Sequence, residues 1–248
     1  MRTPMIAGNW KLHKTLDEAV NLVGALKTKV KDVDNVEILV APPFTAISML
    51  ATKLAGSNIK IGAQNCYFEP SGAFTGELSA PLLKDAGCDY VIVGHSERRQ
   101  IFGESNEMIN NKVKAVLEAG LSVILCIGET LEERESGEMY DILTTQVKEG
   151  LAGVTDMERV VIAYEPVWAI GTGKTASSEQ AQEVHSFVRG LVQGLYTPEI
   201  AAATRILYGG SVKPGNVDEL MAQSDVDGAP VGGASLVAED FARIVKFE

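Results

Sequence analysis

Residues 90–127 read YVIVGHSERRQIFGESNEMINNKVKAVLEAGLSVILCI, and they carry the plainest indication of the architecture. The segment begins and ends with short apolar runs, 90–93 and 122–127, whose β-branched residues favour strands. Between them, apolar side chains recur at helical spacing from Ser105 to Gly120, and a glycine can adopt the left-handed conformation that ends a helix. The segment therefore predicts one strand–helix–strand unit.

The same alternation continues in both directions along the chain. Eight short apolar runs are expected to form strands: 5–9, 36–41, 59–63, 90–93, 122–127, 160–164, 205–208 and 226–231. Two further segments predict helices, one over 15–30 with apolar residues along one face, and one that opens with a Ser-x-x-Gln capping box at 177–180 and continues toward residue 195. Strands that are apolar on both faces are typical of a parallel sheet covered by helices.

The number of these units favours a closed barrel. A chain of 248 residues matches the roughly 250 residues of a (β/α)8 barrel, and no Pro-rich, Ser-rich or low-complexity linker divides it. We therefore expect an α/β fold in which residues 1–248 form a single (β/α)8 barrel domain. An open, doubly wound sheet is the competing topology, but the first strand leads into the sequence GNWK (8–11) rather than a Gly-x-Gly-x-x-Gly turn.

Composition and charge argue against several classes of protein. The net charge of −11 disfavours sequence-independent binding to nucleic acid or to an anionic membrane. No apolar run approaches the ~18 residues of a membrane span, and polar residues interrupt the N-terminus before a signal-length run can form. The three cysteines are odd in number and form no Cys-x-x-Cys pair, which favours a reducing compartment. We expect a cytoplasmic protein with no nucleic-acid or membrane partner.

Polar side chains gather where the predicted strands end. They are Asn9 and Lys11 after the first run, His95 after the fourth, Cys126 and Glu129 at the fifth, and Glu165 after the sixth. Because chemistry in a barrel takes place at the carboxyl ends of the strands, this set predicts an active site. Taken singly, Lys11 fits a solvated rim, His95 a structural histidine and Glu165 a helix cap, so only their joint presence favours catalysis. No group of residues has the pattern that zinc or iron needs, so neither a metal nor another cofactor is expected.

Three glycine-rich segments follow the later strands, at 171–174, 209–211 and 232–235. Free backbone N–H groups at such turns can bind a phosphate, and the phosphate site common in barrels lies after strands seven and eight. The alternative is that these are turns that merely need glycine. Two of the three segments fall at the usual position, which favours a phosphorylated substrate.

Six motifs give the chain a resemblance to the triosephosphate isomerase family along essentially its whole length. They are GNWK (8–11), VGHSERR (93–99), CIGE (126–129), AYEPVWAIGTGKTA (163–176), YGGSV (208–212) and VGGASL (231–236). The resemblance implies a TIM barrel enzyme of glycolysis and gluconeogenesis, an aldose–ketose isomerase that interconverts dihydroxyacetone phosphate and D-glyceraldehyde 3-phosphate without a cofactor. It also implies a homodimer.

The resemblance assigns chemical roles to the matching residues. Glu165 would move the proton through an enediolate, and His95, kept neutral, would donate to the enediolate oxygens. Lys11 would add a positive charge, and Asn9 would orient the oxygens. By the same resemblance, Glu97 would be a partner of Lys11 that does not itself touch the substrate.

The resemblance also makes residues 166–176 a mobile lid that keeps water from the enediolate, which would otherwise expel its phosphate. The residues implied to bind phosphate are Gly171, Ser211, Gly232 and Gly233. Those implied in the lid and its latch are Pro166, Trp168, Ile170, Glu129, Tyr208 and Ser211. Cys126, at the end of the fifth predicted strand, could influence the acidic side chains of the site without touching the substrate itself.

The segment 64–79 resembles the dimer loop of the family, in which Thr75 reaches into the partner subunit beside Asn9 and Lys11. An ordinary surface loop is the alternative. The segment combines Tyr67, Phe68 and Phe74 with glycines, however, and this is an unusually apolar mixture for a solvated loop.

One position departs from the family pattern. The family usually has a bulky apolar residue, commonly leucine, where this sequence has Pro230, and proline also removes a strand N–H. We expect Pro230 to face Ile170 over Glu165 and to loosen the apolar contact there, which would lower turnover. Two other interpretations stay open: another phosphosugar enzyme on the same barrel, such as a ribulose-phosphate epimerase, and a catalytically silent barrel. The first would lack the joint set of motifs, and Pro230 is the one hint of the second.

Overall fold

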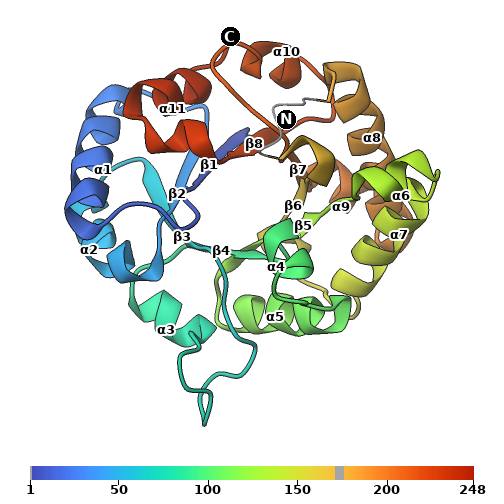
Figure 1. Ribbon diagram of the computed structural model, residues 1–248, viewed down its shortest axis with the longest axis horizontal. Coiled ribbons are helices and arrows are strands. Elements are labelled where there is room, and N and C mark those ends of the chain that lie inside the picture. The colour runs from blue at the N-terminus through green and yellow to red at the C-terminus, as the bar shows by residue number, and fades with distance from the viewer. Residues whose placement is uncertain (1, 171–175) are drawn as a thin grey trace.

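The computed structural model describes residues 2–170 and 176–248. Within this part of the chain, eight parallel strands form a nearly closed barrel surrounded by helices (Figure 1). The strands are β1 (Met5–Asn9), β2 (Glu37–Ala41), β3 (Ile59–Ala63), β4 (Tyr90–Val93), β5 (Ser122–Ile127), β6 (Val160–Tyr164), β7 (Arg205–Tyr208) and β8 (Gly228–Val231). Consecutive strands from β1 to β7 are paired, and β8 pairs with β1. The predicted (β/α)8 barrel is confirmed.

Two strands begin later than predicted, β2 at residue 37 and β8 at residue 228. At β8 the reason is the side chain of Asp227, which accepts a hydrogen bond from Ile206 N at 2.9 Å. The Asp227 N–H in turn donates to Ile206 O, also at 2.9 Å. A side chain thus takes the place of a strand residue where β7 meets β8.

Helices cover the outside of the barrel (Figure 1). They are α1 (Leu16–Val30), α2 (Phe44–Leu54), α3 (Ala80–Asp85), α4 (Ser96–Gln100), α5 (Asn106–Glu118), α6 (Leu131–Glu135), α7 (Met139–Gly150), α8 (Ser178–Leu195), α9 (Pro198–Ala203), α10 (Val217–Met221) and α11 (Ala238–Val245), with 3-10 turns η1 (Met157–Arg159), η2 (Val167–Ala169) and η3 (Gly233–Leu236). The predicted caps are confirmed, since Ser177 accepts a backbone hydrogen bond at the start of α8 and Gly120 has φ 77° after α5. Ser105 caps α5 in the same way, which was not predicted from the sequence. No helix among the described residues is long and apolar enough to cross a membrane.

Inside the barrel, side chains become smaller toward the carboxyl ends of the strands. Met5 is followed by Ala7 at the next inward position of β1, and Val161 by Ala163 in β6. Because side chains alternate along a strand, the inward positions after these alanines are Asn9 and Glu165. The alternation therefore leaves space at this end of the barrel and directs two polar side chains toward it.

The opposite end of the barrel is closed by Glu37, Lys60, Tyr90 and Arg205, which we call the lower cluster. Glu37 Oε1 accepts a hydrogen bond from Tyr90 Oη at 2.6 Å and lies 2.8 Å from Lys60 Nζ. Its Oε2 accepts from Arg205 at 2.6 Å. Burial raises the pKa of Glu37, but these partners outweigh burial and lower the pKa to about 2. Both carboxylate oxygens are thus used within the cluster.

Candidate active site

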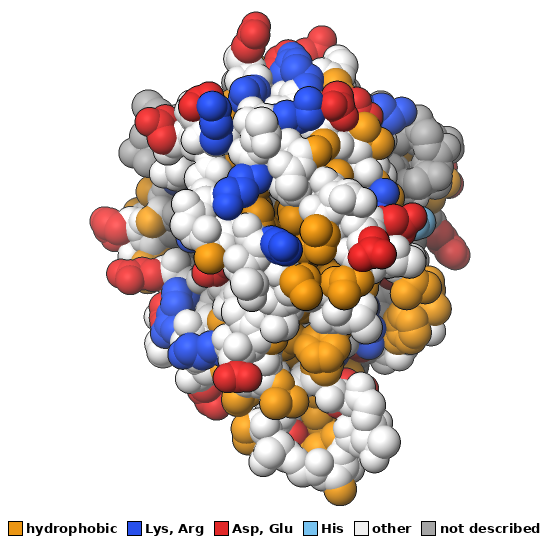
Figure 2. Space-filling model, turned by 90° about the vertical axis from the view of Figure 1, so that its left-hand side faces the viewer, with side chains coloured by type: hydrophobic (Ala, Val, Ile, Leu, Met, Phe, Trp, Pro, Cys, Tyr) orange, Lys and Arg blue, Asp and Glu red, His pale blue; other side chains and the backbone are white. Residues whose placement is uncertain are grey.

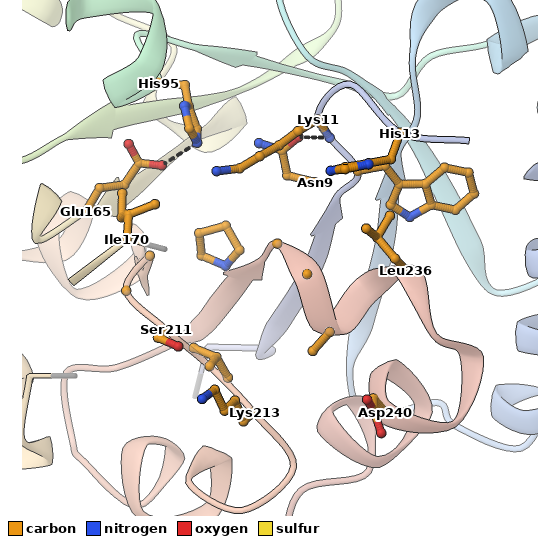
Figure 3. A pocket seen from close by; sticks show the side chains of 18 of the residues that line it. Asn9, Lys11, His13, His95, Glu165, Ile170, Ser211, Lys213, Leu236 and Asp240 are labelled. Atoms are coloured by element: carbon orange, nitrogen blue, oxygen red, sulfur yellow. Dashed lines mark hydrogen bonds and ion pairs between the residues drawn. The ribbon is translucent and has the colours of Figure 1, made fainter. Parts of the chain in front are cut away.

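A pocket of about 560 Å³ opens at the carboxyl ends of the strands (Figure 3). Its lining includes Asn9, Lys11, His95, Glu165, Ile170, Ser211, Pro230, Gly232 and Gly233. The structure therefore brings together the residues that the sequence assigned to chemistry and to phosphate binding, apart from Gly171, which lies outside the described residues. Among the described residues, no group of three His, Cys, Asp or Glu side chains is placed to hold a metal ion.

Glu165 and His95 face each other on one side of this pocket (Figure 3). Glu165 follows β6, is 3% exposed, and has its Oε1 3.2 Å from His95 Nε2. His95 precedes α4, where its Nδ1 accepts the Glu97 N–H at 3.2 Å. A ring nitrogen that accepts a hydrogen bond carries no proton, so the proton of a neutral imidazole is on Nε2, the nitrogen beside Glu165.

Lys11 projects into the pocket from the turn after β1, in which its φ of 51° is unusual for a residue with a side chain. Three contacts hold this turn. Asn9 Oδ1 accepts the Lys11 N–H at 3.1 Å, Gln64 Nε2 donates to Lys11 O at 2.9 Å, and Lys11 Nζ lies 2.6 Å from Glu97 Oε1. The expected pairing of Glu97 with Lys11 is present in the structure, and the Lys11 charge lowers the pKa of Glu97 against the effect of burial.

Two glycines after β7 let the backbone of this turn lie very close to the side chains of Glu165 and Tyr208. A Cβ on Gly209 would lie 2.7 Å from Glu165 Cγ, and a Cβ on Gly210 would lie 2.2 Å from Tyr208 Oη. A side chain at either position would displace one of these two groups. The pKa of Tyr208 is raised to about 12, because the effect of burial is larger than the opposing effect of the nearby Ala176 backbone. The Tyr208 hydroxyl thus lies beside the residue at which the described chain resumes after 171–175.

Glu129 connects the end of β5 to the segment 166–170. Its carboxylate is completely buried, and Oε1 accepts from Trp168 Nε1 at 2.9 Å and from Tyr164 Oη at 3.0 Å. Arg134 lies 3.1 Å from the same oxygen, and the Glu129 carbonyl accepts from Val167 N at 3.0 Å. These contacts hold η2, which begins directly after Pro166, against β5.

Three further groups lie around Glu165, of which only Cys126 was named from the sequence. The thiol of Cys126 is fully buried, and burial, together with the neighbouring Glu165, raises its pKa. Ser96 donates its backbone N–H to Glu165 Oε2 at 2.9 Å, although the VGHSERR motif gave this residue no role. Gln146 of α7 clamps Gly128, accepting from its N–H at 2.8 Å and donating to its C=O at 3.0 Å. No local pattern distinguishes this glutamine from others on helical surfaces.

The segment 64–79, which contains Thr75, projects beyond the ring of helices between β3 and α3 (Figure 1). Its aromatic rings gather together, with ring centres 4.3 Å apart for Tyr67 and Phe68 and 4.7 Å apart for Tyr67 and Phe74. Figure 2 shows hydrophobic side chains on the surface above this loop. Thr75 is exposed and is not among the residues that line the pocket of its own chain.

Comparisons with known proteins agree over the whole chain. The sequence model of the triosephosphate isomerase family matches residues 4–248. The chain is 62% identical to triosephosphate isomerase of Syntrophotalea carbinolica over 250 residues, covering 100% of this chain and 99% of that protein. It is 58% identical to triosephosphate isomerase of Trichlorobacter lovleyi and 56% identical to that of Geotalea uraniireducens, with 100% of this chain covered in both cases and 100% and 99% of those proteins.

Proposed function

The chain belongs to the triosephosphate isomerase family, and we propose that its own side chains interconvert dihydroxyacetone phosphate and D-glyceraldehyde 3-phosphate by moving one proton between adjacent carbons. The observation that carries this proposal is the convergence of a buried carboxylate, an imidazole N–H and an ammonium group on one pocket. Glu165 and His95 are 3.2 Å apart there, and Lys11 lines the same space.

Glu165 is the base in this mechanism. Its carboxylate takes a proton from C1 of dihydroxyacetone phosphate, the C–H electrons form the C1–C2 double bond, and the C2 carbonyl oxygen becomes an oxyanion. His95 presents Nε2–H to this oxygen and assists transfer of the hydroxyl proton from O1 to O2. Glu165 then returns its proton to C2, and the aldehyde forms at C1.

Lys11 and the glycine-rich turns bind the anionic parts of the substrate. The Lys11 ammonium stabilises the oxyanion, and Asn9 orients the oxygens. Ser211, Gly232 and Gly233 supply backbone N–H groups to the phosphate, joined by Gly171. A Cβ on Gly232 would be only 3.8 Å from Lys11 Cε, which supports a phosphate held between these turns and Lys11.

Residues 166–176 act as a lid over the bound phosphate. Its first part is held by the contacts of Glu129 with Trp168, and its end lies beside Tyr208, so both ends have fixed attachment points. Ile170 lines the pocket and would cover Glu165 when the lid closes. Exclusion of water would raise the basicity of the carboxylate and protect the enediolate from loss of phosphate.

The active form is a homodimer. A hollow of about 690 Å³ is lined by the exposed Leu12, Ile101 and Phe102, which are 96%, 72% and 64% exposed, and also by Lys11 and Glu97. Exposed apolar side chains of this size mark an interaction surface. The aromatic loop 64–79 of a second copy is a matching occupant, and Thr75 would then reach the groups that hold Lys11.

An assay from D-glyceraldehyde 3-phosphate, coupled to reduction of the ketone product, tests the proposal. Wild-type protein should turn over, and Glu165→Gln should lower kcat by about 10³-fold or more at unchanged Tm, since a positioned base contributes about 10²–10⁴-fold. Turnover of a pentose phosphate instead would favour another phosphosugar enzyme, and no turnover of either would favour a silent barrel. Sedimentation of wild type and Thr75→Arg tests the dimer, because a charge at the proposed contact should yield monomers of low activity.

A further inference from the structure

A second hollow, of about 140 Å³, reaches Glu165 from outside the substrate pocket. It lies between α4 and the turn that follows β5, and its lining includes Ser96, Arg99, Gln100, Thr130, Gln146 and Glu165. We call it the rear hollow. Glu165 is the only described residue that lines both this hollow and the substrate pocket. Glu165 therefore lies between the two spaces.

The two oxygens of this carboxylate have different surroundings. Oε1 lies 3.2 Å from His95 Nε2, which faces the substrate pocket. Oε2 accepts a hydrogen bond at 2.9 Å from the N–H of Ser96, which lines the rear hollow. One oxygen is thus placed for the substrate side and the other for the rear side.

The rear hollow has the size and the polarity to hold water. One water takes about 30 Å³ and makes two to four hydrogen bonds, so the hollow has room for several. Among the described contacts, Arg99 uses three of its five N–H donors, toward Gly94, Asn106 and Cys126. Arg99 and the amide of Gln146 therefore offer further partners to water at this wall.

We propose that the rear hollow is the route by which Glu165 exchanges its proton with solvent while the substrate is bound. This inference rests on the proposed function, in which the closed lid keeps water out of the substrate pocket. In the exchange, the O–H bond of the Glu165 acid breaks as a water in the hollow accepts that proton and supplies another to the carboxylate. In D2O the balance is acid plus D2O giving deuterated acid plus HDO, with no change in charge. Arg99 remains charged throughout and cannot accept the proton.

Isotope partitioning in D2O tests the route. Unlabelled D-glyceraldehyde 3-phosphate is converted with immediate trapping of the ketone, and NMR gives the fraction of product that retains the hydrogen of the substrate. Gln100 is exposed, ends α4 and lines the hollow, so Gln100→Phe should narrow it without touching the catalytic groups. We expect the ratio of retained hydrogen to solvent deuterium to rise about threefold at nearly unchanged kcat/KM, a shift of less than ~1 kcal/mol in the branching.

Two further variants sharpen the result. Gln100→Ala is the matched control, because it widens the same position and should leave the ratio unchanged or lower it. Gln146→Met replaces the amide in the wall of the hollow by an apolar side chain of similar length. This variant should bind water less well and should also raise the ratio of retained hydrogen to solvent deuterium. An unchanged ratio in both Gln100→Phe and Gln146→Met, in enzymes that still isomerise, would show that solvent reaches Glu165 through the substrate pocket, and the inference would be wrong. A wild-type protein that does not isomerise would instead overturn the proposed function.

Discussion

The two ends of the barrel each hold a carboxylate, the partly buried Glu37 at the lower end and the buried Glu165 at the upper end, but the surroundings of the two differ. In the lower cluster, both oxygens of Glu37 are engaged by Lys60, Tyr90 and Arg205. At the upper end, Glu165 has contacts with His95 and Ser96 and also faces a pocket of about 560 Å³. A charge whose partners are all within the protein contributes to stability, whereas a charge beside an open pocket can act on a ligand. We therefore expect substitutions at the upper end to lower activity and substitutions in the lower cluster to lower stability.

The largest expected effect is on catalysis at the upper end. Lys11→Met should lower kcat/KM by about 10³-fold, because removal of one group that stabilises an oxyanion typically costs about 10²–10³-fold. The Lys11–Glu97 pair is partly exposed, so the free energy of unfolding should change by no more than ~1 kcal/mol. Steady-state kinetics and urea unfolding of the same preparation measure both quantities. A fall of less than tenfold would contradict the role of Lys11.

The converse is expected at the lower end. Glu37→Gln leaves two cations without their carboxylate and should lower the free energy of unfolding by about 3 kcal/mol. Its kcat should stay close to that of wild type, because the lower cluster lies at the other end of the barrel. Tyr90→Phe is the control, since it leaves every charge of the cluster in place and removes only two hydrogen bonds, the one that Tyr90 donates to Glu37 and the one that it accepts from Arg205. It should cost about 1–2 kcal/mol. A Glu37→Gln protein that lost activity but kept its stability would contradict the purely structural role of the lower cluster.

Acid should weaken the lower cluster in a defined range. Folding lowers the pKa of Glu37 from 4.5 to about 2. Its stabilisation is therefore fully present above pH 4.5 and is lost as the pH falls toward 2. The difference in unfolding free energy between wild type and Glu37→Gln should shrink by ~2 kcal/mol over this range. Urea titrations of both proteins at several pH values measure it, and a constant difference would refute the assignment.

The smallest expected effect concerns Pro230, which lines the upper pocket with Ile170 and lies opposite Ala7 of β1. A leucine would add about one methylene of apolar cover, worth about 0.8 kcal/mol, so Pro230→Leu should raise kcat by about fourfold. Turnover at saturating substrate is the measurement. Equal turnover of the two proteins would reject the idea that Pro230 weakens the contact over Glu165.

Much of the architecture and part of the site could be predicted from local patterns. The positions of the strands followed from eight apolar runs, and the start of α8 followed from the capping box that begins at Ser177, which accepts a hydrogen bond from the backbone N–H of Gln180. The motifs also named Glu165, His95 and Lys11, which share the pocket. Ser96 stood within one of these motifs, yet its donation to Glu165 was not predicted because a backbone N–H leaves no trace in the residue type.

The order of residues along the chain accounts for the helices and strands of this protein, because strand alternation, helix periodicity and caps depend on neighbours along the chain. Which distant side chains meet depends on how these helices and strands pack. Gln146 of α7 contacts Gly128 in the turn after β5, Asp227 takes the place of a strand residue beside β7, and Glu37 pairs with Arg205 across the lower end of the barrel. Such contacts are set by the packing of whole strands and helices, so no short stretch of residues encodes them. The rear hollow belongs to the same class, since it exists only in the space that packed elements leave between them.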